Sequence, residues 1–142
     1  MIIADTNVVS EFMKDTPDPQ VLGWAQGLAA AALTISVVTV EEIDRGLGRL
    51  PNGRRRQDLE RRWVRLLDAF ADTIATYDLT AARATARILI EGLDRGRPMS
   101  LADAQIAGIC LAHTAALATR NVKDFTHVSG LTLINPFDHS PS

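Results

Sequence analysis

The first ten residues, MIIADTNVVS, constrain the fold of this chain more than any other stretch. Residues 2–4 form a short apolar run, too short for a helix and typical of a buried strand. Asp5, Thr6 and Asn7 follow at once, at the place where an α/β protein passes from a strand into a helix. Open α/β sheets hold their ligands at the carboxyl ends of their strands. We therefore expect Asp5 to stand at a ligand-binding edge.

Short apolar runs alternate with amphipathic stretches along the rest of the chain. This alternation favours an α/β fold with a parallel sheet of about five strands, covered by helices on both faces. The last long helix is apolar almost all round, which predicts that it is buried between other elements. Strands are predicted over residues 2–4, 33–38, 73–77, 116–119 and 131–134, and helices over residues 8–13, 21–28, 39–47, 54–70, 79–93 and 101–113.

Length and composition match one ordinary soluble domain. The chain has 142 residues, of which 46% are hydrophobic and 23% charged, and its net charge of −2 gives no overall attraction for nucleic acid. The lone Cys110 lies in an apolar helical pattern and is expected to be a buried side chain in a reducing cytoplasm. The sequence has no secretion signal and no membrane-spanning run. We expect a single domain over residues 1–142, located in the cytoplasm with no membrane partner.

Four acidic residues follow predicted strands or open predicted helices: Asp5, Glu42, Asp103 and Asp124. Each also has a purely structural interpretation. Asp5 is a favoured type of residue for the cap of the first helix. Glu42 and Asp103 are the fourth residues of capping-box patterns that begin at Thr39 and Ser100. Asp124 reads equally well as an exposed acid in a turn.

The four acids taken together favour a metal site. In a parallel sheet the strand ends of one polarity lie on one side, so these acids are expected to converge. Each close pair of carboxylates costs about 4 kcal/mol at an effective dielectric constant of about 20, so such a group needs a cation. Oxygen ligands of this kind suit Mg²⁺ or Mn²⁺. The scattered histidines (His113, His127 and His139) are interpreted as structural, which argues against zinc.

A magnesium site built from oxygen ligands suits the hydrolysis of phosphodiester bonds. The ion activates a water molecule and neutralises the charge that builds up on the phosphate. Helix amino termini beside the acids would add a positive dipole for that phosphate. Since no serine or cysteine nucleophile with a paired base is evident, direct attack by water is the expected route.

Four blocks of the sequence carry a resemblance to a known family: IIADTNVVSE, ISVVTVEEIDRG, MSLADAQIAGICLAH, and ALATRNVKDF with LINPF. Together they resemble the PIN-domain ribonucleases, in particular the VapC/FitB-type toxins of bacterial toxin–antitoxin pairs. The blocks occur in the family's order and spacing and cover almost the entire chain. The resemblance implies an α/β/α sandwich with an acidic pocket at the carboxyl ends of its strands.

The resemblance also implies residue roles. Asp5, Glu42 and Asp103 match the family's acids and would be metal ligands. Some members place a fourth acid at the position of Asn121, whereas Asp124 supplies it here, directly or through water. Four polar neighbours would orient the carboxylates or border them: Thr6, Asn7, Thr119 and Asn121.

The biology that the resemblance implies is the cleavage of cellular RNA, often in tRNA or ribosomal RNA loops, which slows translation. A cognate antitoxin would block the acidic pocket with its C-terminal segment, often by an arginine. The antitoxin's N-terminal part would bind operator DNA, so this chain would reach DNA only through the antitoxin. Homodimers and larger toxin–antitoxin assemblies are expected.

Residues 54–65 form a basic stretch with a net charge of +4, which leaves −6 for the rest of the chain. Such a stretch either holds an RNA backbone away from the metal or forms a solvated helix face with Arg–Glu pairs. Trp24 is expected in the core, and Trp63 is expected in the core or in the groove for the antitoxin rather than as a platform for base stacking. The possible RNA-binding residues are Arg54, Arg55, Arg56, Arg61, Arg62 and Arg65.

Two other function classes compete with the nuclease. The chain is alternatively a largely non-catalytic PIN subunit of a DNA-bound toxin–antitoxin repressor complex. A receiver-like phosphoacceptor also has a doubly wound fold with acids at its strand ends. That class needs an acid pair after the first strand and a lysine after the last, and this chain lacks the arrangement.

Overall fold

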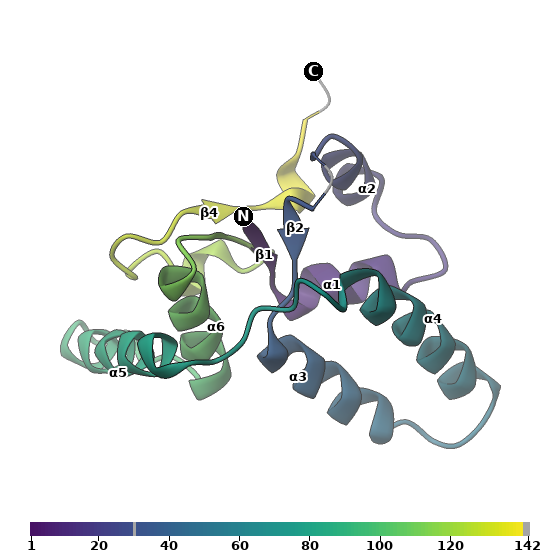
Figure 1. The fold of residues 1–142 in the computed structure, drawn as a ribbon, viewed down its shortest axis with the longest axis horizontal. Helices are drawn as coiled ribbons and strands as arrows, with labels where there is room; N and C mark the ends of the chain where they lie inside the picture. The colour runs from purple at the N-terminus through teal and green to yellow at the C-terminus, as the bar shows by residue number, and fades with distance from the viewer. Residues whose placement is uncertain (30, 141–142) are drawn as a thin grey trace.

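A parallel sheet of four strands forms the centre of the fold, in the spatial order β2-β1-β3-β4 (Figure 1). The computed structural model describes residues 1–29 and 31–140. The strand order reverses between β1 and β3, which makes this point the topological switch where open α/β sheets bind ligands. The strands are β1 (Ile2–Ala4), β2 (Leu33–Thr34), β3 (Ala116–Ala118) and β4 (Leu133–Ile134).

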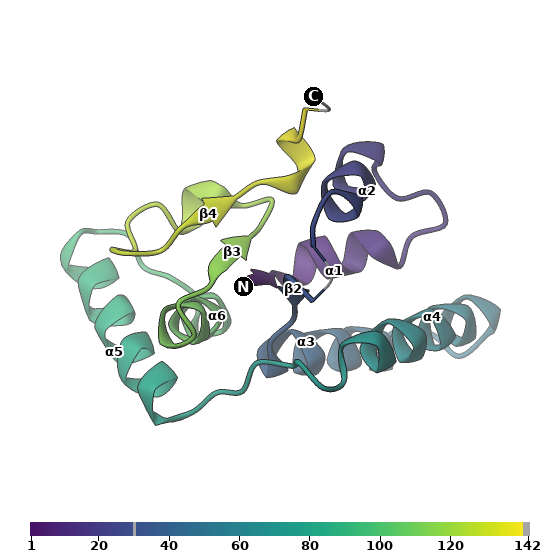
Figure 2. The ribbon, with the colours of Figure 1, turned by 45° about the horizontal axis from the view of Figure 1, so that its top comes forward.

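Helices cover both faces of the sheet, with α5 and α6 on one side and α1 to α4 on the other (Figure 2). Successive residues of a strand point to opposite faces. Ile3 and Leu117 accordingly enter the core under α5 and α6, and Ala4 and Ala118 enter the second core. The helices are α1 (Thr6–Phe12), α2 (Pro19–Gln26), α3 (Val37–Gly48), α4 (Arg54–Phe70), α5 (Leu79–Asp94) and α6 (Leu101–Ala112), with 3₁₀ turns η1 (Val122–Asp124) and η2 (Pro136–Asp138).

The α/β class and the parallel sheet are confirmed, but the strand expected over residues 33–38 is too long. The strand ends at Thr34, and Val37 already belongs to α3. Ser36 causes this change, because its side-chain oxygen accepts a hydrogen bond from Thr39 N at 3.3 Å and so caps the helix. The β-branched run favours a strand by propensity, but the cap at Ser36 starts a helix there instead.

The expected strand over residues 73–77 is also wrong. Only Ala75 pairs there, in a single parallel bridge to Ser36, with Ala75 N donating to Ile35 O at 2.8 Å. A longer strand has no partner, since the chain opposite turns into α3 at Val37. The sheet consequently has four strands rather than about five.

Several expectations for single side chains are confirmed. Trp24 and Trp63 are buried, and Trp63 Nε1 donates to Asp44 Oδ1 at 2.8 Å. Cys110 is fully buried, and burial raises the pKa of its thiol to about 12, which makes it an inert core side chain. In the described part of the chain, no helix is both long and apolar enough to cross a bilayer.

Candidate active site at the carboxyl edge of the sheet

Asp5 stands directly after β1, at the switch point of the sheet, and is only 5% exposed. Its carboxylate Oδ1 accepts a hydrogen bond from Thr6 N at 2.8 Å, so Asp5 does cap α1. Its other oxygen, Oδ2, accepts from Thr119 Oγ1 at 2.8 Å and from Asn7 Nδ2 at 3.4 Å. These bonds fix the orientation of the carboxylate, which goes beyond what a helix cap alone requires.

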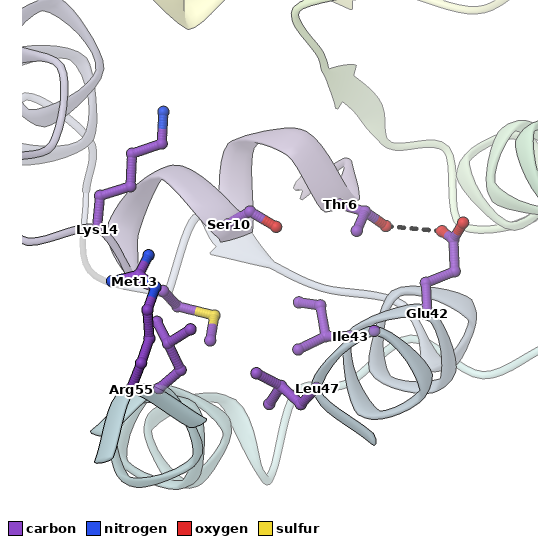
Figure 3. Close-up of a pocket in the computed structure, with 10 residues that line it drawn as sticks. Thr6, Ser10, Met13, Lys14, Glu42, Ile43, Leu47 and Arg55 are labelled. Carbon is purple, nitrogen blue, oxygen red and sulfur yellow. Dashed lines mark hydrogen bonds between the residues drawn. The ribbon is translucent and has the colours of Figure 1, made fainter. Parts of the chain in front are cut away.

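Glu42 lies on α3 and reaches across to α1 (Figure 3). Thr6 Oγ1 donates to Glu42 Oε1 at 2.7 Å and lies 3.0 Å from Thr39 Oγ1. Because Ser36 caps α3, Glu42 is not the closing residue of a capping box that starts at Thr39. Thr6 thus contacts both acids, Asp5 through its backbone and Glu42 through its hydroxyl.

Asp103 and Asp124 line a second part of the site, a cavity of about 420 Å³. Asp103 lies half-buried in the first turn of α6, and its backbone N donates to Ser100 Oγ at 3.2 Å, so the predicted cap is present. Asp124 belongs to η1 and is exposed, which agrees with its interpretation as a turn acid. Arg97 and His127 line the same cavity.

Thr119 connects Asp5 to the segment that carries Asp124. Its hydroxyl donates to Asp5 and accepts a hydrogen bond from Asn121 N at 3.0 Å. Asn7 completes the link, because its Oδ1 accepts from Arg120 N at 3.1 Å. The expected polar neighbours therefore do contact the acids or each other, although Asn121 contributes its backbone rather than its side chain.

The four carboxylates influence one another electrostatically. The pKa of Asp5 is raised to about 6, mainly by burial and also by the charges of Asp103 and Glu42, against the lowering effect of the bonds from Thr119 and Thr6. The pKa of Asp103 is also raised, by burial and then by the charges of Glu42 and Asp124. Residues far apart in the sequence thus form one acidic region.

The chemistry of this region suits a hydrated divalent cation. A positive charge among the carboxylates would offset both the burial and the mutual repulsion that raise the pKa of Asp5 and Asp103. Within residues 1–29 and 31–140, no group of three Asp, Glu, His or Cys side chains lies close enough together to hold a metal ion on its own. Mg²⁺ tolerates such an open arrangement, because it keeps several waters and takes one or two carboxylates.

Besides Arg97, sequence reasoning missed His127 as a residue of this cavity. Both of its ring nitrogens are buried and lack a hydrogen-bond partner among the described residues, as does His113 Nε2. An isolated histidine in a turn gives no sequence signal that would place it beside Asp103 and Asp124. Its position follows only from the folding of the segment after η1.

The six arginines of α4 divide into two groups. Arg56, Arg61 and Arg62 form ion pairs with Glu60, Asp58 and Asp15, and Arg62 also donates to Met13 O at 2.8 Å. The interpretation as a solvated helix face with ion pairs therefore applies to these three arginines. The remaining arginines have no ion pair in the described part of the chain: Arg54, Arg55 and Arg65.

A groove of about 280 Å³ begins beside Glu42 and runs between α1, α3 and α4 (Figure 3). Glu42 lies at one end, and Lys14 and Arg55 lie at the other. The groove is therefore acidic at the end beside the site and basic at the far end. Its apolar lining comes from Met13, Ile43, Leu47 and Leu59.

Comparisons with known proteins give a consistent result over nearly the whole chain. The model of the PIN domain matches residues 2–131. The chain is 36% identical to "VapC ribonuclease Y4jK" of Sinorhizobium fredii over 97% of its length and 99% of that protein. It is 30% identical to "Toxin FitB" of Neisseria gonorrhoeae over 96% of its length and 99% of that protein. The solved "Structure of FitAB bound to IR36 DNA fragment" matches with a TM-score of 0.89 and 30% identity, over 99% of both chains.

Proposed function

Because this chain belongs to the PIN-domain family, and within it to the VapC/FitB-type toxins, we propose that it is an Mg²⁺- or Mn²⁺-dependent endoribonuclease. Its substrates are structured RNAs such as tRNA or ribosomal RNA loops, and their cleavage inhibits translation. The observation that carries this proposal is the contact of Thr6 with both Asp5 and Glu42 beside Asp103. A network that holds several repelling carboxylates in fixed orientations has a use when a cation binds between them.

The residues divide the work as follows. Thr119 and the backbone of Thr6 orient Asp5, and the hydroxyl of Thr6 orients Glu42. These two carboxylates and Asp103 would hold the ion, with Asp124 as a direct or water-mediated ligand. When bound, the ion supplies Lewis-acid activation of water and neutralises charge on the phosphate.

The helix ends at the site assist the phosphate. The amino terminus of α6 lies at Asp103, and its backbone dipole places partial positive charge near an incoming phosphodiester. Asp5, with a pKa of about 6, holds a proton part of the time near neutral pH when no cation is present. A cation favours the ionised form of Asp5 and so replaces that proton.

The cognate antitoxin is the expected protein partner, and the groove between α1, α3 and α4 suits it. A basic antitoxin side chain would approach Glu42, while an acidic one would meet Lys14 and Arg55. The apolar lining would take the hydrophobic face of the same segment. Contacts with operator DNA would then be made by the antitoxin.

A homodimer is also expected, and one exposed apolar area suits it. Val37, Tyr77 and Leu101 line a shallow cavity at the start of α3 and α6, and all three are exposed. The ion pair of Glu41 and Arg45 borders this area and offers both signs of charge. We propose that this area meets the same area of a second copy about a two-fold axis.

The second candidate function is a largely non-catalytic subunit of a DNA-bound repressor complex. It is favoured by the similar FitAB structure, which is bound to a DNA fragment. Four acids without catalytic use would be a cost to the fold, because each close pair repels. The enzymatic function is therefore preferred.

Expression without antitoxin separates the two functions. The wild-type protein is expected to stop bacterial growth, and Glu42→Gln is expected to abolish this effect while the protein accumulates normally. Glu41→Gln is the matched control, because Glu41 is the exposed neighbour that pairs with Arg45. Growth inhibition that persists in Glu42→Gln would support the binding function instead.

A further inference from the structure

Two arginines after α5 hold the segment that carries Asp124. Arg97 Nη2 donates to Lys123 O at 2.8 Å, and Arg95 Nη1 donates to His127 O at 2.8 Å. Lys123 directly precedes Asp124 in η1. Both arginines therefore act on the backbone around this acid.

Arg97 also belongs to the connection that leads into α6. Ser100, the cap of α6, follows three residues later, and Asp103 lies in the first turn of that helix. A single side chain thus ties the element of Asp103 to the element of Asp124. The two acids line the same cavity of about 420 Å³, and Arg97 lines it with them.

The backbone of Arg97 is itself fixed by the end of α5. Gly96 N donates to Leu93 O at 3.1 Å and Arg97 N donates to Gly92 O at 2.7 Å, the two bonds of a Schellman motif. Gly96 has a φ of +67°, which glycine adopts without steric cost. At Gly92 an added Cβ would lie 2.7 Å from Arg97 O, so only glycine allows this close approach.

The position of Asp124 depends on its flanks, because η1 buries no residue of its own. On one side Asn121 N is bound to Thr119, and on the other side Phe125 is buried in the core. Arg97 holds the stretch between these two anchors. The same Lys123 carbonyl also accepts a bond from Thr126 Oγ1 at 3.2 Å, but Thr126 belongs to the same turn, whereas Arg97 ties the turn to another part of the chain.

We propose that Arg97 is a positioning residue that holds Asp124 opposite Asp103 and thereby increases the affinity of the site for a divalent ion. This inference rests on the proposed function, because it takes Asp124 as part of the metal site. Residues that orient metal ligands commonly contribute a factor of about 10–100 in metal affinity. When the hydrogen bond of Arg97 to Lys123 O is removed, the affinity for Mn²⁺ is expected to fall about 10-fold.

The first test compares Arg97→Met with Arg87→Met in the purified protein. Arg87 is the matched control, since it is exposed on α5 and its side chain makes no hydrogen bond among the described residues. Hydrogen exchange should accelerate at residues 121–126 in Arg97→Met, with α6 unchanged. Mn²⁺ titration followed by electron paramagnetic resonance should show the loss of about 10-fold in affinity. Arg97→Lys, which keeps one donor, should fall between the two.

A double-mutant cycle with Asp124→Asn decides whether Arg97 acts through Asp124. If it does, Arg97→Met lowers Mn²⁺ affinity in the wild type but not in the Asp124→Asn background. An equal loss in both backgrounds, or unchanged exchange and Mn²⁺ affinity in Arg97→Met, overturns the inference. So does unchanged Mn²⁺ affinity in Asp124→Asn, which leaves the nuclease proposal standing on Asp5, Glu42 and Asp103. Failure of the nuclease proposal itself would appear in Asp5→Asn, as undiminished RNA cleavage.

Discussion

The hydroxyl of Thr6 donates a 2.7 Å hydrogen bond to Glu42 Oε1 and so joins the start of α1 to the middle of α3. In the described part of the chain, Thr6 is the one residue that donates a side-chain hydrogen bond to Glu42, so this contact sets the orientation of the Glu42 carboxylate. It also brings the acids of two different helices to one edge of the sheet. The geometry of the proposed metal site therefore depends on a neutral residue.

Removing this hydroxyl should impair catalysis more than substrate binding. Thr6→Val keeps the size of the side chain but leaves Glu42 without its donor, so kcat is expected to fall about 10–100-fold. The KM for RNA should change little, because Thr6 does not lie in the basic stretch. Steady-state cleavage kinetics measure both constants. Thr80→Val, an exposed threonine of α5, is the control, and an equal kcat for Thr6→Val and wild type would exclude the positioning role.

The stability of the ion-free protein should fall as the pH rises. The folded pKa of Asp5 is about 6, above its ordinary value of 3.8, so the folded state binds the proton more tightly than the unfolded state. Stability is therefore highest below pH 4 for this group and declines through pH 6, by a total of about 3 kcal/mol. Asp103 contributes in the same direction.

Asp5→Asn removes this dependence on pH. In EDTA at pH 7.5 the variant should unfold at a higher denaturant concentration than the wild type, and its stability should vary less between pH 4.5 and 7.5. Urea unfolding at three pH values measures the effect. If the free energy of unfolding changes with pH by the same amount in both proteins, Asp5 is not the source of the pH dependence.

Gly108 should tolerate no larger residue. An added Cβ would lie 2.3 Å from Thr85 Oγ1 and 2.7 Å from Ala81 O, where α6 packs on α5. Gly108→Ala is expected to destabilise the fold by about 1–3 kcal/mol through this overpacking. Gly46→Ala is the contrasting substitution, because nothing lies within 4 Å of its Cβ position. It should stabilise α3 by up to about 1 kcal/mol in thermal unfolding, and a loss of similar size at both glycines would contradict the packing explanation.

RNA binding should distinguish the two groups of arginines on α4. Arg54→Gln combined with Arg55→Gln is expected to weaken binding and to reduce the slope of log K against log salt concentration by up to about 2. Arg61→Gln should change neither, because this arginine is already paired with Asp58. Fluorescence anisotropy with a catalytically inactive protein gives these slopes. Equal effects at paired and unpaired arginines would favour a general solvated face.

The parts of the fold that sequence predicted well are those decided by local pattern. The bounds of α4 were predicted residue by residue, since Pro51, Asn52 and Gly53 precede it and an amphipathic period runs to Phe70. The prediction of a strand around Val37 is wrong. β-Branched residues suit a strand, but Ser36 accepts a hydrogen bond from Thr39 N and so starts a helix at Val37. Tertiary context, not propensity, sets such boundaries.

The site was predictable as a set of acids but not as a network. Asp5, Glu42 and Asp103 each carry a sequence signal, namely a position after a strand or near the start of a helix. The contact of Thr6 with Glu42 joins different helices, and Arg97 reaches a backbone carbonyl. Carbonyl acceptors are present at every residue, so no sequence pattern distinguishes the one at Lys123. Such contacts follow only from the three-dimensional structure.

Cleavage of structured RNA by the purified protein in Mg²⁺ or Mn²⁺ tests the central claim most directly. Wild-type protein should cut the RNA, EDTA should stop it, and Asp5→Asn should be slower by more than about 100-fold, because even indirect partners of metal ligands contribute that much. Folding of the variant is checked by circular dichroism in the same buffer. If folded Asp5→Asn cleaves as fast as the wild type, the acidic edge of the sheet is not the catalytic site.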